Sequence, residues 1–181
     1  MRLQIREASE SDRKDIYRLR HSVYARELAQ HSENQDGSLT DDLDDFNTYI
    51  AAVLGDRVLG FVSITPPGQT YSVDKYISRD ALPFELGEHT YETRLLTVDR
   101  SHRNGNLAIL LTYAGFRWVE AHGGTRIIAM GRTDLLEFYQ KTGFQGTGVV
   151  VRSGALTFEI MSATVDRGKE FVGIHKKLID R

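Results

Sequence analysis

The sequence contains no cysteine. This absence excludes disulfide bonds, thiolate metal sites and cysteine nucleophiles, and it is typical of proteins in a reducing cytoplasm, which is the location we expect. The chain also has no apolar run approaching the roughly 18 residues that a membrane-spanning helix needs. The first residues, MRLQIREASESDR, have no apolar stretch of the kind found in a secretory signal peptide. We therefore expect neither a membrane span nor a cleaved leader.

The sequence also lacks a large excess of charge of either sign. The 23 basic residues nearly balance the 25 acidic ones, which gives a net charge of −2. Such a chain has no general attraction for nucleic acid or for an anionic membrane, so any anion-binding site must be local. The six histidines show no spacing typical of metal ligands, and we expect no metal.

The 181 residues fit one domain with a substantial core. The pattern predicts a strand, a helix that begins with a Ser9–Asp12 capping box, a long acidic loop over 30–45, and a hairpin that turns at Gly55. Another strand, a helix after residue 106, a strand, a second helix capped by Asp134 with Glu137, and a final hairpin follow. The segment 69–89 is compatible with a short helix or a strand.

This alternation predicts an α/β domain around one partly parallel sheet. The long central helix is expected to bury one stripe, made of Leu107, Leu110, Leu111, Ala114 and Trp118. We place the domain at residues 1–165, followed by a C-terminal tail at 166–181 with helical character.

Two motifs in the second half of the sequence resemble motifs of a known protein family. Between a strand and the central helix stands Arg103-Asn104-Gly105-Asn106-Leu107-Ala108, and further on stands Phe138-Tyr139 followed by Gly143-Phe144. With the strands around them, they resemble the core of the GNAT superfamily of acyl-CoA-dependent N-acyltransferases, over about residues 92–163. The usual glycine at the fourth loop position is Asn106 here, and the glycine stands one place earlier. The resemblance implies a mixed central sheet that splays after the fourth strand and is flanked by helices.

The loop residues Arg103, Asn104, Gly105, Asn106, Leu107 and Ala108 suit an anion. A helix N-terminus offers unpaired amides and a partial positive charge, and an arginine adds a charge-assisted contact, so this turn can hold the diphosphate of coenzyme A. The alternative is a plain turn closed by an asparagine cap. The backbone of Leu96, Thr97 and Val98 would then bind the pantetheine arm and the thioester oxygen, unless this stretch is ordinary core strand.

Two residues are candidates for proton transfer. Tyr139 would protonate the leaving thiolate, and Glu92 would take a proton from the attacking amine, directly or through water. The alternatives are that Phe138 and Tyr139 only pack the helix onto the sheet, and that Glu92 only forms an ion pair with Arg94, which shares its strand face.

A narrower resemblance lies in the first half. Arg20, Tyr24, Asp44, Phe46, Asn47, Glu92 and Arg94 are similar to positions in the branch that makes N-acyl homoserine lactones and N-acyl amino acids. The tryptophan of that branch after the first helix is missing, and the Glu92–Arg94 spacing is one residue short. Arg20, Tyr24, Asp44 and Arg94 would bind the acceptor, with an arginine fork on its carboxylate and the acidic loop on its ammonium group. The alternative is a solvated helix face and a solvated loop.

These observations predict direct transfer of an acetyl or other acyl group from coenzyme A to a primary amine of a small molecule. A second hypothesis is a long-chain N-acyl amino acid or homoserine lactone-type synthase that uses acyl carrier protein. A third, of another class, is a non-catalytic acyl-CoA-binding module of a larger protein. A wide apolar channel past Leu96 would favour long chains. No nucleic acid partner is expected, and a homodimer stays open.

Overall fold

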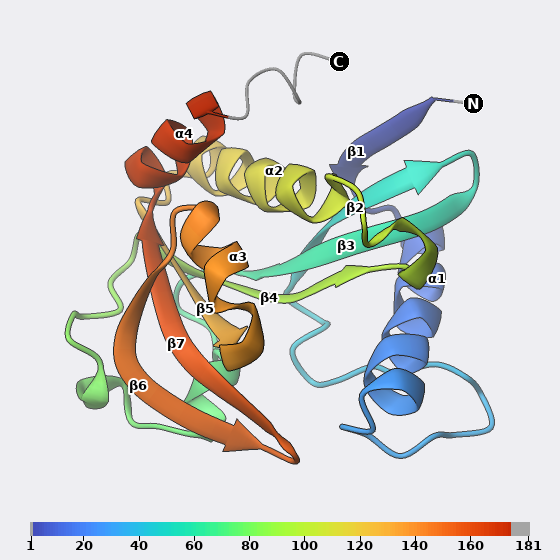
Figure 1. The fold of residues 1–181 in the computed structure, drawn as a ribbon, viewed down its shortest axis with the longest axis horizontal. Helices are drawn as coiled ribbons and strands as arrows, with labels where there is room; N and C mark the ends of the chain where they lie inside the picture. The colour runs from blue at the N-terminus through green and yellow to red at the C-terminus, as the bar shows by residue number, and fades with distance from the viewer. Residues whose placement is uncertain (1, 175–181) are drawn as a thin grey trace.

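The computed structural model describes residues 2–174. Its centre is a seven-stranded sheet in the order β1-β2-β3-β4-β5-β7-β6 (Figure 1). Neighbouring strands are antiparallel except β4 and β5, which are parallel. The strands are β1 (Leu3–Glu7), β2 (Thr48–Leu54), β3 (Arg57–Thr65), β4 (Thr90–Val98), β5 (Arg126–Arg132), β6 (Gln145–Ser153) and β7 (Leu156–Thr164). The predicted mixed α/β sheet is confirmed.

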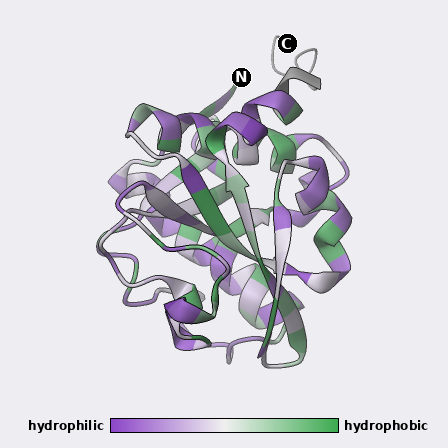
Figure 2. Cartoon of the chain, turned by 90° about the vertical axis from the view of Figure 1, so that its left-hand side faces the viewer, coloured by the Kyte–Doolittle hydropathy of each residue, from purple (hydrophilic) through white to green (hydrophobic). Residues whose placement is uncertain are grey.

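Helices cover both faces of this sheet. They are α1 (Glu10–Arg20), α2 (Leu107–Ala121), α3 (Leu136–Lys141) and α4 (Val165–Ile174). Shorter turns are the π-helix η1 (His21–Glu27), which continues α1, and the 3-10 helices η2 (Ser72–Lys75), η3 (Arg79–Ala81), η4 (Arg100–His102) and η5 (Thr133–Leu135). In Figure 2 the central strands hold the most hydrophobic segments, whereas the helices alternate between hydrophobic and hydrophilic residues. No helix of the described part is long and apolar enough to cross a membrane.

The core divides into three clusters because successive side chains of a strand point to opposite faces. The largest cluster joins α2 to β2–β5 and β7 through residues such as Leu111, Phe116 and Ile127. On the opposite face, Ile16 of α1 packs against β2 and β3. There, too, the segment after β3 contributes Tyr71, which packs with Ile128 of β5. The site described below lies on the α2 face.

The sheet splays between β4 and β5, as the GNAT resemblance implies. These strands pair only where Thr90–Glu92 meets Arg126–Ile128, although β4 continues to Val98. A bulge in β4 accompanies the split: Phe61 pairs with Thr97 and Ser63 with Arg94, so β4 has one extra residue there. Leu95 in this bulge has φ of 56°, a left-handed conformation that non-glycine residues rarely adopt. The bulge bends β4 away from its parallel neighbour.

Several local predictions can be checked against this fold. The Ser9–Asp12 capping box is confirmed, and so is the hairpin turn at Gly55, whose φ of 64° suits glycine. The predicted cap of the second helix is wrong: Leu135 is the N-cap of α3, and the Asp134 carboxylate instead accepts hydrogen bonds from Arg132 at 2.6 and 3.0 Å. The segment 69–89 is mostly irregular and holds the 3-10 helices η2 and η3 rather than a strand.

The buried stripe of α2 was predicted only in part. Of the predicted residues, Leu107 and Leu111 are buried. The other buried residues of α2 are Gly115, Phe116 and Val119, which were not predicted. Leu110, Ala114 and Trp118 are half-buried. The burial of Phe116 has a cause outside α2: α4 packs alongside, with the Gly168 backbone against the Phe116 ring. The helical segment of the expected tail is therefore in contact with the domain at Gly168 and Phe171, and the remainder of that tail, 175–181, lies outside the described residues.

Candidate active site

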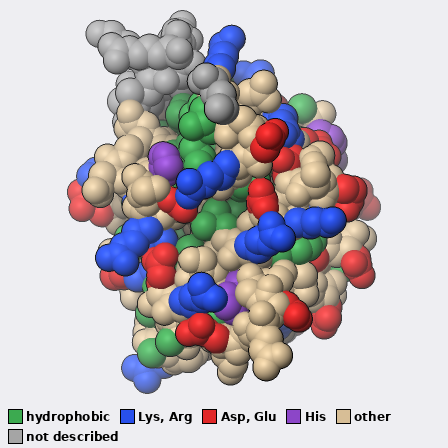
Figure 3. All heavy atoms as spheres, turned by 90° about the vertical axis from the view of Figure 1, so that its right-hand side faces the viewer, with side chains coloured by type: hydrophobic (Ala, Val, Ile, Leu, Met, Phe, Trp, Pro, Cys, Tyr) green, Lys and Arg blue, Asp and Glu red, His purple; other side chains and the backbone are tan. Residues whose placement is uncertain are grey.

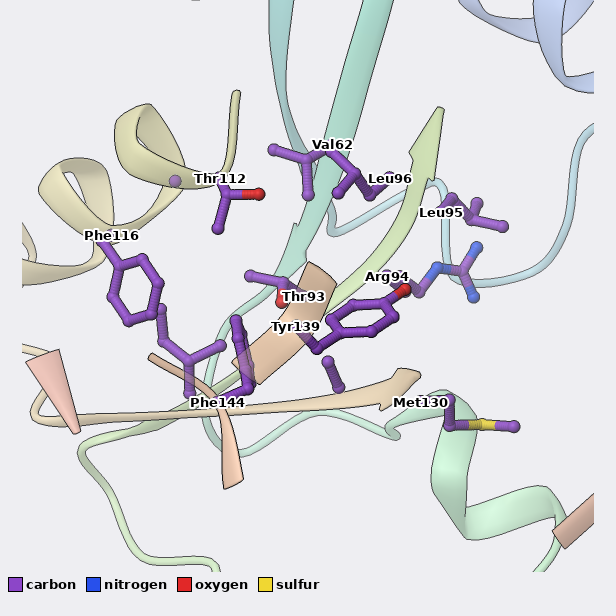
Figure 4. A pocket seen from close by; sticks show the side chains of 13 residues that line it. Val62, Thr93, Arg94, Leu95, Leu96, Thr112, Phe116, Met130, Tyr139 and Phe144 are labelled. Carbon is purple, nitrogen blue, oxygen red and sulfur yellow. The ribbon is translucent and has the colours of Figure 1, made fainter. Parts of the chain in front are cut away.

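A pocket of about 430 Å³, part of it open to solvent, lies where β4 and β5 separate (Figure 4). The gap between the strands is closed on one side by α2 and α3. Its lining is mostly apolar, with Arg94, Thr93, Thr112 and the hydroxyl of Tyr139 as the polar groups. The lining residues are Val62, Thr93, Arg94, Leu95, Leu96, Thr112, Gly115, Phe116, Ile127, Ala129, Met130, Tyr139 and Phe144. An apolar pocket with a few polar groups is the usual form of a small-molecule site.

Tyr139 is held in this pocket by its ring. A Cβ atom on Gly131 of β5 would lie 3.0 Å from the Tyr139 ring, so the glycine lets the ring approach the strand closely. The ring also packs edge-on against Phe138 and Phe144, with centroid distances of 5.5 and 6.0 Å. Burial, and to a lesser extent the neighbouring Tyr24, raise the pKa of the Tyr139 phenol. The side chain therefore packs α3 onto the sheet and also keeps a protonated hydroxyl in the pocket.

The β4 residues predicted to bind the donor lie along the split. Leu96 lines the pocket, and the Thr97 hydroxyl donates to the Leu95 carbonyl at 2.8 Å. The carbonyl of Val98 accepts a hydrogen bond from Nε of Arg103 at 2.9 Å. Because β4 has no pairing with β5 beyond Glu92, this stretch faces the split rather than a neighbouring strand. Its contact with a pantetheine arm stays a prediction.

The turn before α2 is compatible with a bound anion. Asn106 is the N-cap of α2, as the alternative of a turn with an asparagine cap expects, but its side chain makes no capping hydrogen bond. Asn106 has φ of −88°, which needs no glycine, and a Cβ on Gly105 would meet only the His102 carbonyl at 3.6 Å. The displaced glycine of the motif therefore causes no backbone strain. The first amides of α2 lack a side-chain cap, as a helix terminus that binds an anion requires.

Arg103 of this turn already has an anionic partner. Its two terminal nitrogens donate to the Glu27 carboxylate at 2.6 and 3.2 Å. Glu27 ends the π-helix η1, so the ion pair joins the N-terminal helical region to the β4–α2 turn. For Arg103 to bind a diphosphate, its guanidinium must either release the Glu27 carboxylate or contact both anions at once. Glu27 could not be identified from the sequence, because it belongs to no motif and lies 76 positions from Arg103.

Three of the four residues predicted to bind the acceptor meet in one buried ion cluster. Arg20 donates to both oxygens of Asp44 at 2.8 Å and to Asp41 at 2.9 Å. Arg94 donates to Asp41 and lies 3.9 Å from Asp44. Tyr49 adds a hydrogen bond to Asp44. The alternative of a solvated helix face and loop is therefore wrong for Arg20, which is only 2% exposed, and for Asp44.

The charges of this cluster balance internally. Burial alone would raise the pKa of Asp41, but the Arg94 and Arg20 guanidiniums lower it below its ordinary value. Both terminal nitrogens of Arg20 hold aspartates, so its predicted fork for an acceptor carboxylate is already occupied. Arg94 differs because it also lines the pocket, whereas the Nε atoms of both arginines lack a hydrogen-bond partner. Acceptor binding by this set stays a prediction, with Arg94 as the member that faces the pocket.

Tyr24, Phe46 and Asn47 lie around the cluster. Tyr24 is in η1, and its hydroxyl is 3.2 Å from the Thr97 hydroxyl on β4. Burial raises the pKa of the Tyr24 phenol. The Asn47 amide bridges Ser63 and Thr65 of β3 at 3.0 and 2.8 Å, which is a structural role. Phe46 is half-buried.

Glu92 has a different set of partners from those predicted. Its carboxylate accepts hydrogen bonds from the Ser72 amide at 2.7 Å, the Ser72 hydroxyl at 2.6 Å and the Val73 amide at 3.2 Å. The predicted ion pair with Arg94 is wrong, because Arg94 binds the aspartates. Glu92 is fully buried and does not line the pocket, and burial raises the pKa of its carboxyl. Its proposed role as a base stays a prediction, and the observed contacts make it the cap of η2. Among residues 2–174, no group of three or more histidines and acids is placed to hold a metal ion.

Comparisons with solved structures show the fold. The acyl-homoserine lactone synthase BjaI, described as CoA-dependent and solved with SAM and isopentyl-CoA, superposes with a TM-score of 0.80 at 18% identity over 94% of this chain and 88% of BjaI. The AHL synthase LasI gives 0.74 at 13% identity, over 91% and 89%. An N-acetyltransferase fold from Lactobacillus plantarum gives 0.71 at 17% identity, over 91% and 99%. A search of curated protein sequences finds no match.

Comparison with sequence families gives a more specific result. The sequence model described as N-acyl amino acid synthase FeeM matches residues 15–166, which is most of the chain. The match includes the buried ion cluster, the splayed strands, the turn before α2 and Tyr139. Together with the fold, it shows that this chain is an acyltransferase and belongs to the FeeM family of N-acyl amino acid synthases.

Proposed function

We propose that this protein transfers an acyl group longer than acetyl from the thioester of coenzyme A to the amino group of an amino acid or a similar small amine. The observation that carries the proposal is the apolar pocket of about 430 Å³ between β4 and β5. The lining of this pocket is mostly apolar, so an alkyl chain longer than acetyl would bury more of it than an acetyl group does. The family description supports an amino acid as the acceptor.

The chemistry is a direct displacement. The free amine attacks the thioester carbon, the C–N bond forms and the C–S bond breaks. The leaving thiolate takes one proton from the Tyr139 hydroxyl, the attacking nitrogen loses one proton to water, and the Tyr139 phenolate regains a proton from water, so that an amide and a free thiol result. The Tyr139 hydroxyl is protonated at neutral pH and lines the pocket, which makes it available as the donor. In this proposal, a backbone amide of β4 at the bulge donates to the developing oxyanion.

The donor is held at two places in this proposal. Its acyl chain lies in the pocket, and its diphosphate lies at the uncapped first turn of α2, with Arg103 as the charged contact. That BjaI is described as CoA-dependent supports coenzyme A as the carrier. On the face that Figure 3 shows, basic and acidic side chains are interspersed, which gives no large positive field for an acidic carrier protein there. The lack of cysteine supports action in the cytoplasm.

The test uses a series of acyl-CoA thioesters from acetyl to long-chain, with thiol release measured against a panel of amino acids. We expect turnover to increase with chain length beyond acetyl. Tyr139→Phe should lower kcat by about 10²- to 10⁴-fold while leaving the donor Kd close to that of the unaltered protein. Arg103→Ala should do the reverse, weakening donor affinity with little effect on kcat.

Other outcomes would favour the other hypotheses. Turnover with acyl carrier protein thioesters and none with the coenzyme A series would identify the carrier protein as donor. Donor binding without thiol release on any amine would favour the non-catalytic module. An unchanged kcat in Tyr139→Phe would remove this residue from the chemistry.

A further inference from the structure

A second, smaller pocket lies behind the first. It is a shallow pocket of about 230 Å³, much of it open to solvent, between α2, α3 and α4, and it is lined by Ile109, Thr112, Tyr113, Phe116, Lys141, Thr142 and Phe171. Thr112 and Phe116 line both pockets. These two side chains of α2 are therefore the wall between them, and Phe116 is by far the larger of the two.

The ring of Phe116 is held from two sides. Its centroid lies 5.6 Å from that of Phe144. On the α4 side, a Cβ built on Gly168 would come within 2.6 Å of its Cδ1 and Cε1 atoms, so the α4 backbone lies directly on the ring. Phe116 is 3% exposed. A ring fixed in this way cannot swing freely toward α4, which keeps the inner end of the larger pocket closed.

We infer that Phe116, clamped by the Gly168 backbone of α4, is the end wall that sets the length of the acyl chain. The inference rests on the proposed function, because it takes the larger pocket to be the acyl site. A chain that reaches the ring must stop or displace it, and displacement opens the way to the second pocket. Phe116 is thus a specificity-determining residue, and α4 contributes to specificity without touching the substrate.

The affinity of acyl thioesters should show this wall directly. Each methylene buried in an apolar site strengthens binding about fourfold, from roughly 0.8 kcal/mol per CH₂. We expect the logarithm of Kd to fall steadily with chain length and then to level or reverse where the chain meets Phe116. The position of that break is the measured quantity, and calorimetry on acyl-CoA thioesters of increasing length gives it without any acceptor amine.

Substitutions at Phe116 and at Gly115 should move the break in opposite directions. Phe116→Ala joins the two pockets, so the break should shift to longer chains, with Kd for those chains improved by tenfold or more. Phe116→Leu should give a smaller shift of the same sign and serves if the alanine variant does not fold. Gly115→Ala adds a methyl group to the lining of the larger pocket, where its Cβ would meet Val62 at an ordinary 3.6 Å, so the break should shift to shorter chains.

Phe171→Ala is the matched control. It removes an aromatic ring from the second pocket but leaves the wall intact, so the break should stay in place. A shift in Phe171→Ala equal to that in Phe116→Ala would show that general loosening of the α2–α4 contact, not the wall, controls length. An unchanged break in both Phe116 variants would overturn the inference.

The experiment separates this inference from the proposed function. The series is run with coenzyme A thioesters and with acyl carrier protein thioesters, since both donors present the same acyl-pantetheine. If thioesters of either carrier bind but no amine is acylated, the proposed transfer fails while the wall is still tested. If no thioester of either carrier binds, the acyl site itself is wrong, and the inference falls with it.

Discussion

Glu92 has a buried carboxyl group whose three hydrogen bonds all lead away from the pocket. Its donors are the amide and hydroxyl of Ser72 and the amide of Val73, at the start of η2. A carboxylate at the N-terminus of a helical turn accepts from otherwise unpaired amides, which offsets the cost of burying it. The geometry therefore makes Glu92 the anchor of the segment between β3 and β4 rather than a group that meets the amine.

This contact set gives a prediction for Glu92→Gln. The glutamine amide group would point a donor at backbone donors, so the variant should lose about 1–3 kcal/mol of unfolding free energy in urea. Its kcat should fall by less than tenfold, because the side chain does not reach the substrate. Ser72→Ala, which removes one donor from the other side of the same contact, should lose stability by a smaller amount. A loss in kcat of a hundredfold or more in a folded Glu92→Gln protein would restore the role of general base.

A site residue could be predicted where it belongs to a sequence motif. It could not be predicted where only its contact partner in the fold identifies it. Arg20, Asp44 and Arg94 were singled out from the sequence, and the fold brings them together. Their mutual pairing, however, depends on how α1, the loop before β2 and β4 meet. The pairs Glu27–Arg103 and Ser72–Glu92 join positions 76 and 20 residues apart, and no local spacing reveals them.

At the scale of the element, the start of α1 combines a cap with an ion pair. The Ser9 amide and hydroxyl donate to Asp12 at 2.7 and 2.6 Å, and the Arg6 guanidinium donates to the same carboxylate at 2.6 and 3.2 Å. The Arg6 guanidinium first, and the Ser9 donors after it, lower the pKa of Asp12 from 3.8 to about 2, against the opposing effect of burial. The charged form of Asp12 therefore stabilises the junction of β1 and α1.

The lowered pKa has a defined consequence for stability against pH. Because the folded-state value lies below the unfolded one, the contribution of Asp12 is complete above about pH 4 and is lost as the pH falls toward 2. We expect a loss of about 1–2 kcal/mol over this window, since Arg6 is partly exposed and solvent screens the pair. Asp12→Asn should be less stable at pH 7 and should lose this part of the acid dependence in urea unfolding. Glu10→Gln, an exposed acid in the same turn, is the control and should leave the acid slope unchanged.

Elements with a strong local signal were predicted, and elements set by their neighbours were not. The hairpin at Gly55 and the cap of α1 follow from residue types at fixed offsets. The prediction that Asp134 caps α3 is wrong because the Asp134 carboxylate accepts hydrogen bonds from Arg132 instead. The segment 69–89 has no periodicity of its own, and its turns are held by contacts such as Ser72–Glu92. The splay was foreseen only through the family resemblance, since a bulge at Leu95 has no signature in the residues around it.

At the scale of the whole molecule, the sheet consists of two halves joined by a short parallel contact. One half is β1–β4 and the other is β5–β7, and their strands pair only over Thr90–Glu92 and Arg126–Ile128. The helices α2, α3 and α4 cover the seam, and the pocket lies within it. Both halves line this pocket, so a donor bound there as proposed would contact both and take the place of the missing strand pairing, which would link donor binding to the integrity of the sheet.

This linkage predicts both the size and the place of stabilisation by a donor. At 100 times its Kd, a ligand that binds only the folded state adds about 2.7 kcal/mol, which raises Tm by about 5–11 °C for a chain of this length. Amide hydrogen exchange should slow most in β4 beyond Glu92 and in β5 beyond Ile128, because these stretches lack each other as partners. Free coenzyme A, which has no acyl chain to fill the seam, is the control and should give a smaller shift, with protection at the turn before α2 and along residues 96–98 of β4 but not in β5 beyond Ile128. Equal protection by both ligands would mean that the acyl chain does not lie between the two halves.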